Sequence, residues 1–219
     1  MQKELENLQL EMNVRKAQYE LLQLIFSHPL SVEVFQSLKE QELNGNEYLF
    51  AFSKELGVRE LSEVAAFERE QFMQLFVGPG VIPAPPWESV YRSRERLLFG
   101  EQTLKLREKL RSFDLHFEGD GHEPEDHIAT ELEFMGYLIQ TTINAIISQD
   151  EEQFLKAIQT QFSLLEEHLL KWVPPFVEDI LSSTPSSLYK GSALFLQDLI
   201  HEDYQYMNQL KEVLDYELV

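Results

Sequence analysis

The sequence predicts an all-α protein of about nine helices in a single domain. Apolar residues recur at helical spacings of three and four along nearly the whole chain, and the apolar-polar alternation of half-buried strands is almost absent. Glycines and prolines stand between the periodic stretches. With 219 residues, the chain can bury a full-sized core, and its composition does not require a second domain. We therefore expect one all-helical domain over residues 1–219.

The clearest helix is expected from Asp126 to Ser148, where apolar residues repeat at alternating spacings of four and three. The other expected helices are roughly Lys3–Phe26, Val32–Leu43, Glu47–Leu56, Leu61–Phe76, Glu101–Phe113, Glu151–Trp172, Pro175–Leu181 and Ser187–Leu214. Breaks are expected at sites such as Gly57, Gly78-Pro79 and Pro174-Pro175. Two long connectors remain, Val77–Gly100 and Asp114–Glu123. Such connectors are uncommon in a compact helical domain unless they carry function.

The charge of the chain restricts its partners. Its formal net charge is −20, while 43% of its residues are hydrophobic, so the acidic residues decorate a folded protein. This charge disfavours nucleic acid and anionic lipid and favours a basic peptide. The absence of cysteine excludes disulfides and thiolate chemistry and fits a reducing compartment. No secretory signal and no apolar run of about 20 residues is visible, so we expect a cytoplasmic protein without membrane insertion.

The first unusual segment is residues 72–91, FMQLFVGPGVIPAPPWESVY. Its four prolines fall within eight residues and fix the backbone, which predicts a stiff connector. Phe72, Leu75 and Phe76 form one apolar stripe, for which core packing is the ordinary explanation. Trp87 follows two prolines and precedes polar residues, so its indole has one apolar and one polar side. The sequence leaves open whether Trp87 covers the core or anchors a ligand.

The second unusual segment is residues 121–135, GHEPEDHIATELEFM. Pro124 is a natural first helical residue, and the acidic side chains around it complement the helix dipole. His127 and Glu131 are four residues apart, as in an ordinary helical pair. The titratable side chains gathered here are His122, Glu123, Asp126 and His127. Histidine can change its charge near neutral pH, so a functional role competes with a well-built helix start.

Enzymatic motifs are scarce in this chain. No Gly-Lys pair supports a P-loop, no third glycine completes a dinucleotide motif, and no histidine has the Glu-x-x-His spacing of a di-iron bundle. His116, His122 and His127 could gather a metal, although the glycine-rich loop between them leaves the geometry unspecified. The enzymatic alternative is therefore a metal-dependent hydrolase or nucleotidase. It would use His116, His122, Asp126 and His127 as ligands or as acid and base.

Together, FMQLFVGPGVIPAPPWESVY and EPEDHIATELEFMGYL resemble the TorD/DmsD family of redox-enzyme maturation chaperones, because they occur in this order, one helix apart, in an all-α chain of this size. The resemblance is strongest over Glu68–Gln140. It implies a cytoplasmic, non-catalytic chaperone without a cofactor. Such a chaperone binds the twin-arginine leader and apo catalytic subunit of an exported molybdoenzyme until the molybdenum cofactor is inserted. Some relatives instead assemble non-exported nitrate reductases or other metalloenzymes.

The resemblance also implies which residues bind the peptide. These are Leu75, Phe76, Pro86, Trp87, Tyr91, Glu123, Pro124, Asp126 and His127. Glu123 and Asp126 would accept hydrogen bonds from the leader arginines, and Leu75, Phe76 and Trp87 would form an apolar wall, provided that the fold brings the two motifs together. In the family some members form domain-swapped dimers, so a monomer and a swapped dimer are both expected states. Some members bind guanine nucleotides, which the missing phosphate-binding motif argues against here.

Overall fold

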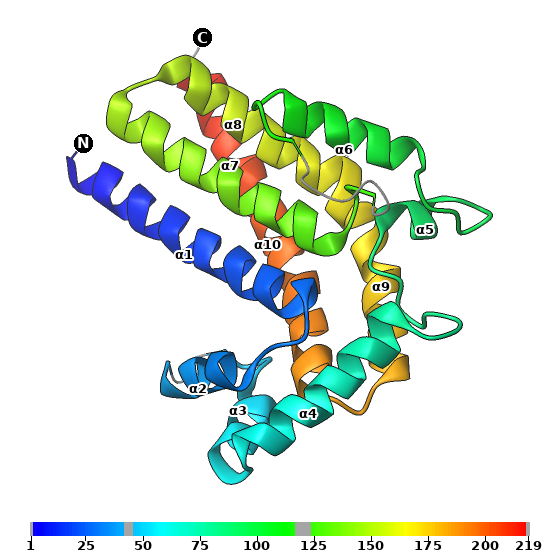
Figure 1. Cartoon of the computed structure of the whole chain (residues 1–219). Helices are drawn as coiled ribbons and strands as arrows, with labels where there is room; N and C mark the ends of the chain where they lie inside the picture. The colour runs from blue at the N-terminus through cyan, green and yellow to red at the C-terminus, as the bar shows by residue number, and fades with distance from the viewer. Residues whose placement is uncertain (1, 42–45, 117–123, 218–219) are drawn as a thin grey trace. The chain divides into compact units, whose positions relative to one another are not determined.

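The computed structural model describes residues 2–41, 46–116 and 124–217, and within them the predicted all-α fold is confirmed (Figure 1). The helices are α1 (Gln2–Ser27), α2 (Val32–Glu40), α3 (Phe50–Val58), α4 (Leu61–Phe72), α5 (Glu88–Arg92), α6 (Glu101–Arg111), α7 (Ile128–Ser148), α8 (Glu151–Leu164), α9 (Leu170–Ser183) and α10 (Ser187–Glu217). Two π-helical stretches, Met73–Val77 and Leu165–Leu169, directly follow α4 and α8. None of the described helices has the length and apolar character needed to cross a membrane.

Most predicted helices are confirmed, and the differences have local causes. The break predicted at Pro174-Pro175 is wrong, because both prolines lie inside α9. The fixed φ of proline is itself helical, so each ring removes a backbone donor without forcing the chain to turn. Gly57 likewise lies inside α3. The helix α5 was not predicted, because its five residues are too few to show a helical period.

The chain divides into two compact units, each built from separate stretches. The first unit comprises Met1–Gln23, Trp87–Trp172 and Leu199–Val219, and the second comprises Leu24–Pro86 and Val173–Asp198. Three helices, α1, α9 and α10, run from one unit into the other. That residues 1–219 form one domain stays a prediction.

In the first unit, α7 packs lengthwise against α8 (Figure 1). The turn between them is tight: Gln149 ends α7 in the left-handed region with a φ of 56°. Asp150 then begins α8 by accepting a hydrogen bond from the Gln153 amide at 3.0 Å. Because α7 buries residues along most of its length, it forms a fixed support for the side chains at its N-terminus.

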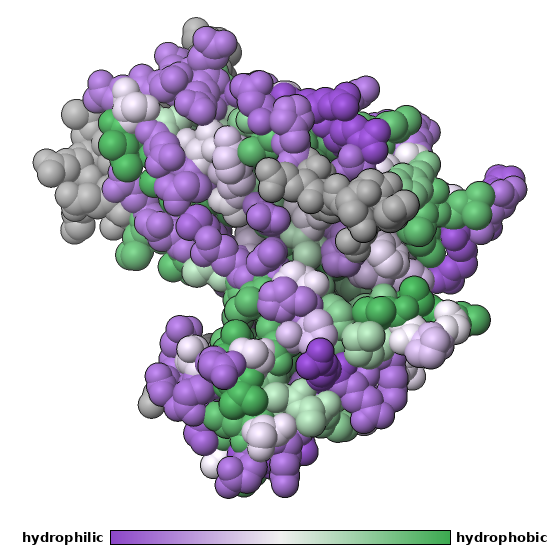
Figure 2. Space-filling view, in the orientation of Figure 1, coloured by the Kyte–Doolittle hydropathy of each residue, from purple (hydrophilic) through white to green (hydrophobic). Residues whose placement is uncertain are grey.

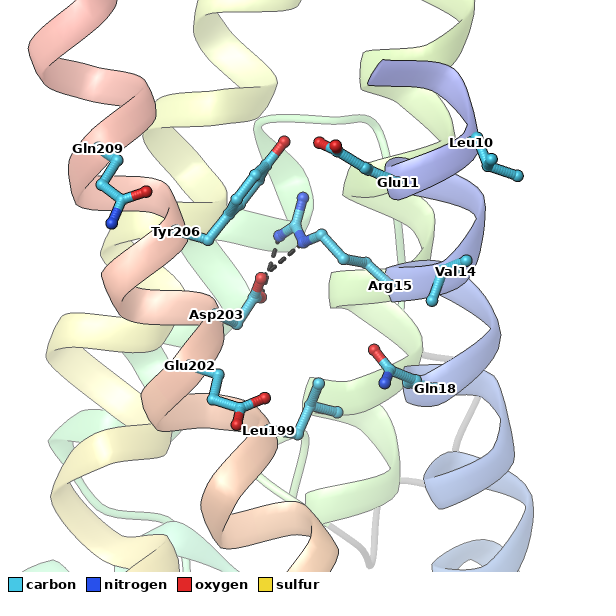
Figure 3. A pocket seen from close by; sticks show the side chains of 10 residues that line it. All are labelled: Leu10, Glu11, Val14, Arg15, Gln18, Leu199, Glu202, Asp203, Tyr206 and Gln209. Carbon is cyan, nitrogen blue, oxygen red and sulfur yellow. Dashed lines mark hydrogen bonds and ion pairs between the residues drawn. The ribbon is translucent and has the colours of Figure 1, made fainter. Parts of the chain in front are cut away.

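A buried ion pair links Arg15 on α1 to Asp203 on α10 within the first unit (Figure 3). Arg15 donates to the two carboxylate oxygens at 2.5 and 2.9 Å, and the Tyr19 hydroxyl donates to Oδ2 at 2.6 Å. Burial alone would lower the pKa of Arg15, but Asp203 raises it above its ordinary value. The pair lines an open pocket of about 680 Å³ between the two helices.

In the second unit, Leu75 and Phe76 lie in the core, with exposed fractions of 1% and 3%. The rings with centroids between 5.2 and 6.1 Å from that of Phe76 belong to Phe26, Phe72, Phe176 and Tyr189. The apolar stripe of Phe72, Leu75 and Phe76 therefore packs into the core, as its helical spacing predicts. Gly78 ends this segment with a φ of 104°, a conformation in which glycine lacks the Cβ strain of other residues.

Gly191 on α10 supports a stability prediction, because a Cβ there would lie 2.2 Å from the Tyr48 carbonyl oxygen in the same unit. We expect Gly191→Ala to lower the free energy of unfolding by about 1–3 kcal/mol, since backbone must move to admit the methyl group. Gly57→Ala is the control, because nothing lies within 4 Å of its Cβ and alanine favours a helix by about 0.5–1 kcal/mol. Denaturant titration measures both, and equal stabilities would contradict the close contact.

Candidate peptide-binding site and a buried polar cluster

The two sequence motifs meet in the first unit. Trp87 and His127 pair as an antiparallel β-bridge, and the Glu88 amide donates to the Asp126 carbonyl oxygen at 2.9 Å. The Trp87 and His127 rings pack edge to face with centroids 5.5 Å apart. The condition placed on the predicted site, that the fold brings the two motifs together, is met for these residues.

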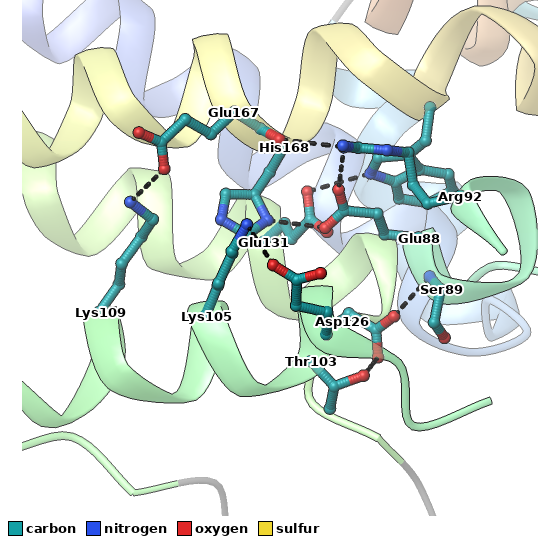
Figure 4. Close-up of polar contacts among 12 residues, drawn as sticks. Glu88, Ser89, Arg92, Thr103, Lys105, Lys109, Asp126, Glu131, Glu167 and His168 are labelled. Carbon is teal, nitrogen blue, oxygen red and sulfur yellow. Dashed lines mark hydrogen bonds and ion pairs between the residues drawn. The ribbon is translucent and has the colours of Figure 1, made fainter.

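Asp126 holds this junction together from inside. Its side chain is fully buried and accepts hydrogen bonds from the Ser89 amide at 2.6 Å and from the Thr103 hydroxyl at 2.8 Å (Figure 4). It thereby joins the starts of α5, α6 and α7. The expectation that Asp126 presents its carboxylate to a leader arginine does not fit this geometry, because both oxygens already have protein donors and the side chain has no exposed surface.

His127 is the N-cap of α7 and accepts a hydrogen bond at Nδ1 from the Ala129 amide at 3.1 Å. Burial lowers its pKa to about 4, because a low-dielectric site disfavours the charged ring. The expectation that this histidine changes charge near neutral pH is therefore corrected. His127 is neutral at pH 7, and its ring acts as a cap and a packing surface.

The remaining predicted residues of the first unit surround this junction. Trp87 is half-buried, and its indole Nε1 is buried without a hydrogen-bond partner. Tyr91, also half-buried, packs against Trp172 with ring centroids 5.6 Å apart. Pro124 is buried. Next to Pro124, Glu125, which was not a predicted site residue, accepts hydrogen bonds from Arg107 at 2.6 and 2.9 Å.

The other predicted residues lie in the second unit, outside the described residues, or after α6. Leu75, Phe76 and Pro86 belong to the second unit, where all three are buried. Glu123 and His122 lie outside the described residues. His116, the third histidine of the alternative metal set, is exposed at the end of the chain segment after α6.

A buried polar cluster beneath the junction was not predicted. Glu88, Glu131 and His168 come from α5, α7 and the π-helical stretch after α8, and all three are at most 1% exposed. His168 Nδ1 donates to Glu88 Oε2 at 2.6 Å, Arg92 donates to Glu88 Oε1 at 2.8 Å, and Trp172 donates to Glu131 Oε2 at 3.2 Å (Figure 4). Burial, with the negative charge of Glu88, raises the pKa of Glu131 well above its ordinary value.

Comparison with known proteins places the chain in a family. The family model described as nitrate reductase delta subunit matches residues 37–178, which is more than half of the chain, and the chain belongs to that family.

Individual relatives carry the chaperone names that the two motifs suggested. The chain is 34% identical over 125 residues to "Probable Tat proofreading chaperone DmsD" of Haemophilus influenzae, covering 57% of this chain and 54% of that protein. It is 27% identical over 201 residues to "Chaperone protein TorD" of Aliivibrio salmonicida, covering 86% and 92%. The alignment spans about half the length of the DmsD relatives. The resemblance to the TorD/DmsD family is confirmed.

The solved structure titled "Crystal Structure Of A Putative Redox Enzyme Maturation Protein From Archaeoglobus Fulgidus" aligns with 85% of this chain and 93% of its own, at 20% identity and a TM-score of 0.47.

Proposed function

We propose that the protein is a non-catalytic cytoplasmic chaperone that binds the twin-arginine leader of a molybdoenzyme precursor and assists cofactor insertion before export. Family membership and the names of the relatives support this proposal. The observation that carries it is the junction of the two motifs at Trp87 and His127. Both motifs contribute to leader binding in the family that the sequence resembles, and here they form one continuous feature.

The junction offers two things that an extended peptide needs. The indole of Trp87 is half-buried, so its exposed part offers aromatic surface to a peptide, while its buried Nε1 has no hydrogen-bond partner. The loop after α5 exposes Leu97, Leu98 and Phe99, with exposed fractions of 57%, 41% and 53%, and Figure 2 shows apolar side chains on this loop. An apolar leader segment can cover such a surface.

In this proposal some of the predicted residues contact the leader, and the others hold the contacting residues in place. We assign contact with the leader to Trp87 and Tyr91. Asp126, Pro124 and His127 support Trp87 by fixing the junction. In the second unit, Leu75, Phe76 and Pro86 give the proline-rich loop its shape, and the Leu75 carbonyl oxygen accepts from the Ala84 amide at 3.1 Å within that loop.

We propose that acidic side chains, Glu123 among them, meet the leader arginines. A chain with a net charge of −20 attracts a basic peptide over long distances, and the attraction weakens as salt rises. A precursor without a leader, as in relatives that assemble non-exported enzymes, would lack this electrostatic contribution.

We expect Trp87→Ala to weaken binding of a synthetic twin-arginine leader by about 2 kcal/mol or more, about thirtyfold, as aromatic anchors typically do. Calorimetry measures the affinity, and circular dichroism checks the fold. Trp87→Phe keeps most of the ring but removes the N–H donor, so it should lie between parent and alanine variant. Phe50→Ala, at a 45% exposed residue of the second unit, is the control for loss of a surface aromatic.

Two results would count against the proposal. Equal leader affinity of the parent and Trp87→Ala would remove Trp87 from the binding surface. If the parent binds the apo catalytic subunit equally well with and without its leader, the client is recognised elsewhere, and the leader-binding function is wrong.

A further inference from the structure

The cluster of Glu88, Glu131 and His168 has the form of an ion site. Each of the three side chains supplies one ligand atom, and these atoms lie within 4.8 Å of one another. All three residues are at most 1% exposed. Carboxylate oxygens and an imidazole nitrogen are donors that zinc accepts together.

The hydrogen bonds of the cluster leave Glu131 Oε1 available, whereas the atoms that Glu88 and His168 would supply are hydrogen-bonded to each other. Arg92 occupies Glu88 Oε1, while Glu88 Oε2 faces His168. Trp172 occupies Glu131 Oε2, while Glu131 Oε1 is buried without any partner. Each carboxylate is thus held from outside by a nitrogen donor, as the outer hydrogen bonds of metal sites hold their ligands.

Glu131 Oε1 points to a missing ligand, because buried polar atoms almost always have a partner and this oxygen has none. His168 Nε2 is also without a partner, but it lies on the other side of the ring from Nδ1, which faces Glu88 Oε2. A cation bound through Nδ1 would therefore satisfy Glu131 Oε1 and leave Nε2 as it is.

We propose that Glu88, Glu131 and His168 form a binding site for one divalent cation of the zinc type, beneath the junction of the two motifs. Each carboxylate contributes one oxygen and His168 one ring nitrogen. Zinc ligands at about 2.1 Å from the ion lie about 3.4 Å apart. His168 Nδ1 and Glu88 Oε2, which are 2.6 Å apart, would therefore separate when the ion enters between them. The proton between His168 and Glu88 leaves when the ion enters, because metal ligands bind deprotonated. This proposal does not depend on leader binding.

The test is zinc titration of the protein purified without a histidine tag and stripped by a chelator, followed by calorimetry. We expect about one tight site per chain, and a zinc absorption-edge spectrum with only nitrogen and oxygen ligands. Zinc should also raise the melting temperature of the parent, because it binds only the folded site.

Two variants and a control variant test whether the ion binds at the cluster. Glu131→Gln keeps the acceptor for Trp172, and His168→Gln keeps a polar side chain, and each should weaken zinc binding at least tenfold. His116→Gln, at an exposed histidine, should bind as the parent does. If the parent has no tight site, or if all three variants bind equally, the proposal is wrong. Equal binding would mean that zinc attaches only to surface carboxylates. The zinc titration of the parent shows by itself whether a tight site exists, so the proposal can be contradicted even if a variant does not fold.

Discussion

Asp203→Ala is expected to lower the free energy of unfolding by about 3–5 kcal/mol, because it leaves the Arg15 guanidinium buried without its counter-ion. Arg15 and Asp203 are only 8% and 4% exposed, so water from the open pocket that they line compensates the lost carboxylate only in part. The Tyr19 hydroxyl loses its acceptor as well. Urea titration, read by circular dichroism, measures the loss.

The double variant Arg15→Met/Asp203→Leu serves as the control for this prediction. Apolar residues of similar size often replace a buried ion pair at little or no cost, so the double variant should be clearly more stable than Asp203→Ala. The surface pair of Lys16 and Glu20, with Glu20 59% exposed, gives a second comparison, since Glu20→Ala should change stability little. A loss below about 1 kcal/mol in Asp203→Ala would contradict the burial of Arg15.

Asp126→Ala is expected to lower the free energy of unfolding by about 2–4 kcal/mol, because the Ser89 amide and the Thr103 hydroxyl are both left buried without an acceptor. Asp126→Asn keeps one carbonyl oxygen and should cost about 1 kcal/mol, since the Thr103 hydroxyl can turn to accept from the new amide. Thermal melting of both variants measures these costs.

The affinity of Asp126→Asn for the leader shows whether Asp126 positions Trp87 or contacts a leader arginine directly. If Asp126 only positions Trp87, as the filled carboxylate suggests, the folded variant should bind a twin-arginine leader within about twofold of the parent. His127→Gln should behave similarly, because the neutral ring it replaces carries no charge to lose at pH 7. A large loss of affinity with an unchanged melting temperature would instead show that Asp126 contacts a leader arginine directly.

The sequence predicted the helices well because their apolar spacing is local information. The helix α7 follows directly from its regular spacing, and the core position of Phe76 follows from its stripe. Pro174 and Pro175 were misjudged, because a proline excludes a hydrogen bond but not a helical φ. Their place inside α9 depends on packing that no short window of sequence contains.

The site was predicted only in part, because local sequence marks unusual segments but does not show which distant residues meet. The prolines and the acidic helix start mark Trp87 and His127 as unusual. The predicted peptide-binding site required the two motifs to meet, but the sequence alone did not show that they do. Burial of Asp126 was missed, because its partners Ser89 and Thr103 are 37 and 23 residues away. Glu131 and His168 also meet across a distance in the chain. In the sequence they are ordinary polar residues of helical stretches that also hold other polar residues, so no local pattern singles them out before the fold joins them.

The discontinuity of the first unit determines when it can form during synthesis. The unit needs Leu199–Val219 as well as Met1–Gln23, so the ribosome must make nearly the whole chain before its last helix can dock. Until then Arg15 has no Asp203, and α1 cannot be buried without an uncompensated charge. Contacts between such distant residues are closed late and slowly. The first unit is therefore expected to fold only after the segment from Leu199 onward has left the ribosome, and a product truncated before residue 199 should be recognised by the cell as unfolded.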